Sequence, residues 1–158
     1  GNIMPRLSDN KFQYNFQDNA IITKLQTILQ LGLIPESYCD LTLDLSPVDL
    51  CAKAIIDLLG SNDSQTVFHI YNNNTIKLQN LLKLSNFNYK IVSDEKMIDT
   101  VKNSSNPRSL HILDDLRNKK VTLTSTVNEK TISLLNSHNF YWNLTDEKYI
   151  NNFFKIFN

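Results

Sequence analysis

Residues 41–60 read LTLDLSPVDLCAKAIIDLLG and contain a predicted strand, a predicted helix and the turn that joins them. Leucine alternates with a polar residue at the start of this stretch, which is the spacing of a strand with one buried face. Ser46 is suited to capping the free amides of a helix, Pro47 to its first position, and Asp49 to the positive end of its dipole. Gly60 ends the helix. The predicted inner face of this helix carries Leu50, Ala54, Ile55, Leu58 and Leu59.

Upstream of this stretch, the sequence predicts a short strand, a loop and a second helix. The strand falls in residues 1–6, and the loop in residues 11–18 is polar and aromatic. Asp18 is placed to cap the helix that begins at Asn19. Apolar residues recur on one face of that helix until Gly32 ends it.

Downstream, predicted strands and helices alternate, and no linker or internal repeat divides the chain. The β-branched and aromatic run TVFHIY at residues 66–71 is the strongest predicted strand. Further extended segments are predicted at 89–92 and 121–127. Helices are predicted at 76–84, 93–101 with Ser93 as its cap, 110–116, 128–137 and in a last segment capped by Thr145. We therefore predict one α/β unit over residues 1–158, with a small, mostly parallel sheet and flanking helices.

The composition argues against several classes of partner. Lys plus Arg and Asp plus Glu both number 16, so the net charge is zero and no field attracts a nucleic acid. Apolar runs are much shorter than a membrane span, and no signal peptide opens the chain. We expect a cytoplasmic protein with no nucleic-acid or membrane partner. Cys39 and Cys51 do not suggest a disulfide framework, and we expect Cys51 to be a buried free thiol.

Glycine is scarce, and this limits which cofactors the chain can bind. The three glycines are Gly1, Gly32 and Gly60, and no two are close in sequence. A dinucleotide or phosphate loop needs clustered glycines, because its backbone must approach the phosphates and turn through positive φ angles. We therefore expect no cofactor-binding residues.

The sequence contains no recognisable catalytic or metal-binding group. His69, His111 and His138 lack a Cys or carboxylate at ligand spacing, and we expect His69 to be a structural residue of its strand. None of the six tyrosines is followed four residues later by a lysine that would lower the phenol pKa for proton transfer to a carbonyl. Asp114 and Asp115 are adjacent on a predicted helix, so they are interpreted as a solvated face or as charges at the positive end of the helix dipole rather than as an acid/base pair. We expect no catalytic residues and no metal ligands.

Four stretches occur in an order that is typical of one enzyme family. Residues 1–13, GNIMPRLSDNKFQ, match the pattern GN…GRSDGxFQxN, which Asn15 continues. Residues 43–55, LDLSPVDLCAKAI, match DFTPVDxCAxAI, and residues 67–72, VFHIYN, match xFHxxN. Residues 139–142, NFYW, followed by Tyr149, match GFxWP…Y. Together they resemble the second half of extended short-chain dehydrogenase/reductases, in particular the terminal thioester reductase domains of nonribosomal peptide synthetases.

The chain departs from the glycine and proline positions of the family patterns. Pro5, Asn10 and Asn139 stand where glycine is common, and Asn143 stands in place of proline. Asparagine tolerates the left-handed conformation, so the change at Asn10 is mild. With Pro5 in place of glycine, the sequence does not determine the backbone conformation beside this residue.

The resemblance implies a division of labour between two halves of the parent enzyme. The first half holds NADPH and a Thr/Ser-Tyr-Lys catalytic group, and the second half forms a lid over the acyl thioester. The chain would then be the substrate-side, C-terminal lobe and would not be catalytic alone. Its partners would be the N-terminal dinucleotide-binding part and an acyl or peptidyl carrier protein with a phosphopantetheine thioester. The product would be released as an aldehyde or alcohol.

The resemblance also suggests which residues face the substrate. We expect the opening loop to run from beside the nicotinamide toward the acyl chain, with a wall formed by Asn2, Arg6, Phe12, Gln13 and Asn15. Alternatives remain open, since Phe12 could belong to the core and Arg6 could pair with a nearby acid. Trp142 is interpreted as a packing anchor, and Asp44 and Asp49 as residues that fix the strand-to-helix turn.

Two other functions compete with the substrate lobe of a thioester reductase. One is a non-catalytic docking module for a carrier protein or its pantetheine arm. The other is the substrate lobe of a nucleotide-sugar reductase or epimerase, against which Ser8-Asp9 and Phe12-Gln13 argue. A coding region upstream of residue 1 with a glycine-rich loop and a Tyr/Lys pair would favour the thioester reductase.

Overall fold

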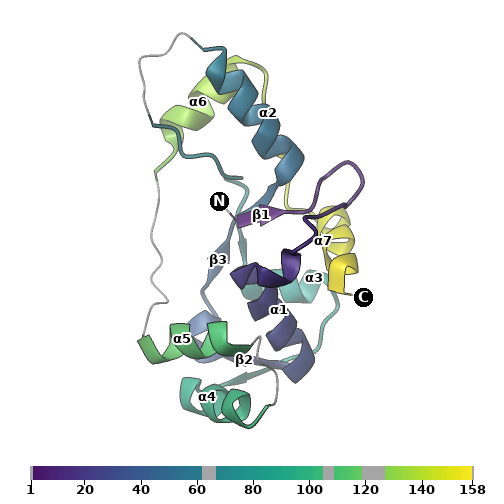
Figure 1. Ribbon diagram of the computed structural model, residues 1–158, viewed down its shortest axis with the longest axis vertical. Helices are drawn as coiled ribbons and strands as arrows, with labels where there is room; N and C mark the ends of the chain where they lie inside the picture. Colours follow the sequence, from purple (N-terminus) through teal and green to yellow (C-terminus); the bar gives the residue numbers. More distant parts are fainter. Residues whose placement is uncertain (1, 62–66, 105–108, 119–126, 158) are drawn as a thin grey trace.

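The computed structural model describes residues 2–61, 67–104, 109–118 and 127–157 (Figure 1). These residues form an elongated α/β structure. Its helices are α1 (Ala20–Leu31), α2 (Val48–Leu59), α3 (Leu78–Leu84), α4 (Asp94–Asn103), α5 (Leu110–Asn118), α6 (Glu129–Ser137) and α7 (Glu147–Phe154). Its strands are β1 (Asn2–Met4), β2 (Leu33–Pro35), β3 (Thr42–Leu43), β4 (Leu45–Pro47), β5 (Ile76–Lys77) and β6 (Lys90–Val92).

The strands form small sheets, two of them parallel. β1 pairs with β4 in parallel, with Ile3 opposite Ser46, and β2 pairs with β6 in parallel. β3 and β5 form an antiparallel pair. The predicted fold class, a small and mostly parallel sheet with flanking helices, is confirmed.

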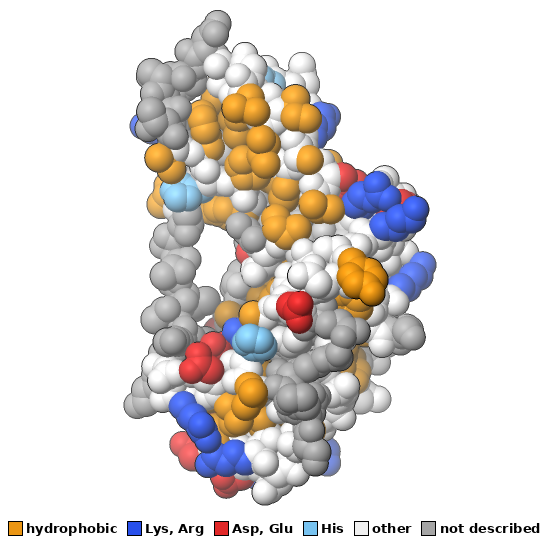
Figure 2. All heavy atoms as spheres, viewed as in Figure 1, with side chains coloured by type: hydrophobic (Ala, Val, Ile, Leu, Met, Phe, Trp, Pro, Cys, Tyr) orange, Lys and Arg blue, Asp and Glu red, His pale blue; other side chains and the backbone are white. Residues whose placement is uncertain are grey.

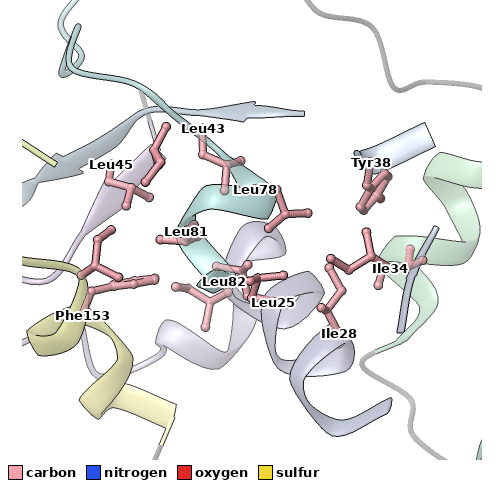
Figure 3. Packing of buried hydrophobic residues seen from close by; sticks show 14 of the residues in the cluster. Leu25, Ile28, Ile34, Tyr38, Leu43, Leu45, Leu78, Leu81, Leu82 and Phe153 are labelled. Carbon is pink, nitrogen blue, oxygen red and sulfur yellow. The ribbon is translucent and has the colours of Figure 1, made fainter. Parts of the chain in front are cut away.

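The buried side chains fall into two hydrophobic clusters. The larger one lies among α1, α3, α7 and the neighbouring strands, and Figure 3 shows Leu25, Leu81 and Phe153 meeting there from different elements. The smaller one joins α2 to α6 and contains Cys51, Ala54, Leu58, Leu135, Phe140 and Trp142. Figure 1 shows α2 and α6 side by side at the top, away from the other helices.

Glycine and asparagine supply the positive φ angles that the turns require. Gly32 ends α1 with φ 63°, as the sequence predicts. Asn10 and Asn139, which stand where the family pattern has glycine, both have φ 58°. Each adopts the left-handed conformation that asparagine tolerates better than most residues, so these substitutions preserve the turns.

Three predicted helix caps are wrong. Asn19, not Asp18, caps α1, and its side-chain oxygen accepts hydrogen bonds from the amides of Ile21 and Ile22. Pro47, the last residue of β4, occupies the N-cap of α2, and the Ser46 hydroxyl instead bonds to Asp44 and to the amide of Asn72. Asp146, not Thr145, caps α7. The Ser93 cap of α4 is confirmed, since its side chain accepts a hydrogen bond from the amide of Lys96.

The strongest predicted strand does not join a sheet in the described part of the chain. Residues 67–71 carry no strand assignment, although Phe68 and Ile70 pack on the smaller cluster. His69 is exposed there. The predicted strand of residues 41–45 is divided at Asp44 into β3 and β4. The extended segment predicted at 121–127 lies outside the described residues except for its last residue.

The predicted inner face of α2 is partly wrong. Ala54 and Leu58 are buried, but Ile55 and Leu59 are exposed. The helix therefore has apolar side chains on two faces, of which one lies against the smaller cluster.

Candidate functional site

The opening loop, residues 5–19, connects β1 to α1 and begins beside a carboxylate. The backbone amide of Asn2 donates to Asp44 Oδ2 at 2.8 Å, and Asn2 Nδ2 donates to Asp44 Oδ1 at 2.6 Å. The Ser46 hydroxyl donates to the same carboxylate at 3.0 Å. The side chain of Asn2 is thus engaged within the chain at the root of the loop, and Asp44 holds β1 beside β4.

A buried asparagine extends this network. Asn72 is fully buried; its amide N–H donates to Ser46 Oγ at 2.9 Å, and its Nδ2 donates to the Leu45 carbonyl at 3.0 Å. The same Nδ2 reaches the Asn143 carbonyl at 3.1 Å. Its Oδ1 accepts from the amide of Asn74 at 2.9 Å, which closes a local turn. The network therefore joins β4 to two distant segments, and residues 72–74 form a turn as predicted.

The N-terminus of α2 holds the first part of the loop. The Asp49 carboxylate accepts hydrogen bonds from the amides of Leu7 and Ser8 at 3.0 and 3.2 Å. Burial raises the pKa of Asp49, but these hydrogen bonds outweigh burial, and the net pKa lies below the ordinary value. Asp49 therefore anchors the loop as well as the strand-to-helix turn.

A tight turn follows, and Arg6 is paired within it. Arg6 forms an ion pair with Asp9, and the amide of Arg6 donates to the Lys11 carbonyl at 2.9 Å. Asn10 Nδ2 donates to the carbonyl of Asn152 in α7 at 2.7 Å. The guanidinium of Arg6 is thus committed to a neighbouring carboxylate, which is the alternative that the sequence left open.

The end of the loop leaves two of the predicted residues exposed. Phe12 is half-buried and packs with the larger cluster and with the Phe16 ring, whose centroid is 5.9 Å away. Gln13 and Asn15 are exposed, as is Tyr14 between them. The structure therefore places Asn2 in β1 and the other four candidates along the loop, and it gives solvent-facing side chains mainly to Gln13 and Asn15.

A cavity is lined by none of the five candidates. It has a volume of about 370 Å³ and is lined by Gln26, Leu29, Gln30, Ser85, Phe87, Phe154 and Phe157. The Oε1 atom of Gln26 is buried without a hydrogen-bond partner.

Three other side chains that the sequence singled out are bonded or packed within the protein. Asp115 is not a solvated carboxylate, because it forms an ion pair with Lys24 and accepts a hydrogen bond from the Tyr38 hydroxyl at 2.8 Å. Burial raises the pKa of the free thiol of Cys51 to about 11. Trp142 is buried and packs edge-on against Phe140, as a packing anchor should.

The described residues lack both a metal-binding cluster and a membrane-spanning helix. Among the described residues, no group of three His, Cys, Asp or Glu side chains is arranged to hold a metal ion. Within the same residues, no helix has the length and apolar character needed to cross a bilayer.

Solved structures with the same fold were found, whereas no protein-family model and no curated protein matches the sequence. One is a thiolation-reductase di-domain from an archaeal nonribosomal peptide synthetase, with 28% identity and a TM-score of 0.80. It is matched over 98% of this chain and 34% of its own. The chain has the fold of part of a peptide-synthetase reductase domain.

Two further reductase structures share the fold at lower identity. The reductase domain of the aureusimine biosynthetic cluster has a TM-score of 0.85 at 19% identity, over 99% of this chain and 42% of its own. The terminal R domain of the myxalamid PKS-NRPS pathway has a TM-score of 0.77 at 17% identity, over 99% of this chain and 41% of its own. The resemblance inferred from the four sequence stretches is thereby confirmed at the level of the fold.

The chain spans only about a third to two fifths of the length of these reductase structures. Almost all of it is matched, so the remainder of each reductase is polypeptide that has no counterpart in residues 1–158. Within the reductase fold, sequence patterns located the opening loop. They missed the buried Asn72 and its link to Ser46, because a hydrogen bond between residues so far apart leaves no local signal.

Proposed function

We propose that the chain is the substrate-side part of an NAD(P)H-dependent thioester reductase, which releases a carrier-bound acyl or peptidyl thioester as an aldehyde or alcohol. The observation that carries the proposal is the match of nearly the whole chain to the archaeal thiolation-reductase di-domain. In that protein a reductase is joined to a thiolation domain. A carrier protein with a phosphopantetheine thioester is accordingly the proposed source of substrate.

The residues present do not fit a nicotinamide coenzyme. Gly32 ends α1 and Gly60 ends α2, so neither lies at the strand-to-helix turn where the phosphates of a dinucleotide are held. We therefore assign NADPH to the dinucleotide-binding part of the parent enzyme.

The opening loop supplies the proposed substrate wall. Asp44 and Asp49 hold its start, so the exposed amides of Gln13 and Asn15 extend from an anchored backbone. Such side chains can bond to the amide groups of a pantetheine arm or a peptidyl chain. Phe12 and Phe16 pack beneath them and keep this part of the loop against the larger cluster.

The test joins this chain to the polypeptide encoded upstream of residue 1 and follows NADPH oxidation with an acyl-pantetheine thioester. Gln13→Ala and Asn15→Ala should each raise KM about 3- to 10-fold with little change in kcat, because a lost hydrogen bond removes about 1 kcal/mol of binding. Asn103→Ala, which removes an amide from the end of α4, is the matched control and should leave both constants unchanged.

The outcomes separate this function from a docking module. A joined protein that oxidises no NADPH, or a gene that begins at residue 1, would contradict the reductase function. Binding of a pantetheine-loaded carrier protein by the isolated chain, without reduction in the joined protein, would favour the non-catalytic module. Equal KM values for Gln13→Ala and the control would remove Gln13 from the substrate wall.

A further inference from the structure

The cavity of about 370 Å³ is the size of a small-molecule pocket, for which the usual range is about 300–1,000 Å³. Its lining comes from α1, from the connection between α3 and β6, and from α7 with the turn after it: Gln26, Leu29, Gln30, Ser85, Phe87, Phe154 and Phe157. Figure 1 shows α1, α3 and α7 grouped together. Hydrophobic side chains also gather at the surface over α2 and α6, in the upper part of Figure 2, but those helices do not line the cavity.

One wall of the cavity is aromatic and is fixed by the core. The ring centroids of Phe154 and Phe157 lie 5.6 Å apart, and the buried ring of Phe153 meets each of them edge-on at 5.5 Å. Phe87 and Leu29 also pack against the larger cluster. Because buried neighbours hold this wall, an aromatic ring can pack on it with little loss of conformational entropy in the protein.

The polar side of the cavity offers hydrogen-bond acceptors. Gln26 Oε1 is buried and has no hydrogen-bond partner in the described part of the chain, which costs free energy. The last torsion of a glutamine side chain is broad, so this amide can turn toward a donor in the cavity. The Ser85 hydroxyl donates to the Leu82 carbonyl at 2.8 Å, and its oxygen can still accept. A ligand with an N–H or O–H group is therefore favoured over one that carries only acceptors.

The charge and size of the cavity narrow the ligand further. Among the described residues that line it, none is charged. An ion buried without a partner is strongly disfavoured, so the ligand should be uncharged. One turn of a helix with its side chains occupies roughly 400 Å³, from a diameter of about 10 Å and a pitch of about 5.4 Å. A partner helix therefore does not fit, whereas a small molecule does.

We propose that this cavity binds a small uncharged molecule with an aromatic ring and one N–H or O–H donor. The ring packs on the phenylalanine wall, and Gln26 accepts the hydrogen bond. The site goes beyond the reductase function and does not depend on it, since no residue of the opening loop lines the cavity.

The test uses indole, a flat bicyclic ring with one N–H donor. Its matched control is benzofuran, which has the same ring shape with an oxygen in place of the N–H. Each compound is titrated into the ¹⁵N-labelled chain and followed by two-dimensional NMR. We expect indole to bind with a Kd below about 1 mM, an affinity that ligands of this size reach. It should bind about 3- to 10-fold more tightly than benzofuran, the factor of one net hydrogen bond.

Three variants locate the binding. Gln26→Met removes the acceptor at similar volume, so it should weaken indole about 3- to 10-fold and leave benzofuran within about 2-fold. Gln79→Met makes the same change at a half-buried residue of α3 that does not line the cavity, and it should alter neither affinity. Ser85→Leu fills part of the cavity and should weaken both ligands at least about tenfold. Tm and the dispersion of the NMR spectrum show whether each variant has folded.

Four results would overturn the proposal. Absence of indole binding would remove the site. Equal affinities for indole and benzofuran, or an unchanged indole affinity of Gln26→Met, would contradict the recognition of a donor. Binding that persists in folded Ser85→Leu would place indole elsewhere, such as on the apolar surface over α2 and α6.

The fourth result concerns the chain joined to the polypeptide encoded upstream of residue 1. Indole binding that is lost in the joined protein would show that a side chain of the added polypeptide fills the cavity. NADPH oxidation by the joined wild-type protein tests the proposed function independently of all four results.

Discussion

At the scale of single residues, Asn72 is the centre of a hydrogen-bond network that should contribute to stability. It is fully buried and its side chain bonds to the Leu45 carbonyl and to Asn143. Asn72→Ala removes the side-chain donor to the buried Leu45 carbonyl and the acceptor of the Asn74 amide, so we expect a loss of about 1–3 kcal/mol in the free energy of unfolding. Urea denaturation measures it, with the exposed neighbour Asn73→Ala as the control. Similar midpoints for the two variants would refute the role of the network.

Asp49 should make the stability of the folded chain depend on pH. Its pKa is lowered in the folded chain by hydrogen bonds from the Leu7 and Ser8 amides. A lowered folded-state pKa stabilises the protein above the unfolded pKa of about 4, and this stability is lost as pH falls through that value and below. Asp49→Asn should therefore reduce stability at pH 7 and flatten its decline between about pH 5 and pH 2. Unfolding curves at several pH values measure this, and an unchanged slope would argue against the anchor.

At the scale of elements, the two helix-ending glycines should differ in their response to alanine. Gly32 has φ 63°, whereas Gly60 has a right-handed helical backbone, and a Cβ at either meets only ordinary contacts. Gly32→Ala should cost about 1 kcal/mol of unfolding free energy through backbone strain. Gly60→Ala should be neutral or stabilise by about 0.4–1 kcal/mol. Thermal unfolding of both variants tests this, and equal shifts in Tm would contradict it.

The sequence located each α-helix of the described residues, but it could not choose among neighbouring caps. Asp18 and Asn19 are both good caps, and Thr145 precedes the equally suitable Asp146; the choice depends on where the backbone first turns helical. Ser46 has the chemistry of a cap, but long-range pairing of β4 with β1 keeps it in a strand. Residues 67–71 have strong strand propensity, yet a ladder also needs a partner strand, which propensity does not reveal.

The sequence indicated where the candidate loop lies, but it did not show which of its side chains are exposed. A resemblance in residues 1–13 located the loop and its five candidates. The structure then showed that Asn2 and Arg6 are bonded to Asp44 and Asp9, and that Phe12 packs on the larger cluster. Only the three-dimensional arrangement separates such residues from Gln13 and Asn15, which are exposed.

At the scale of the whole molecule, the central claim is that this chain forms part of a substrate site, whereas another polypeptide binds the coenzyme. The measurement that tests this most directly is a fluorescence titration of NADPH with the isolated chain and with the chain joined to its upstream part. We expect no saturable binding to the isolated chain below about 1 mM, since it offers no glycine-rich phosphate loop, and saturable binding to the joined protein. Micromolar binding of NADPH by residues 1–158 alone would contradict the account.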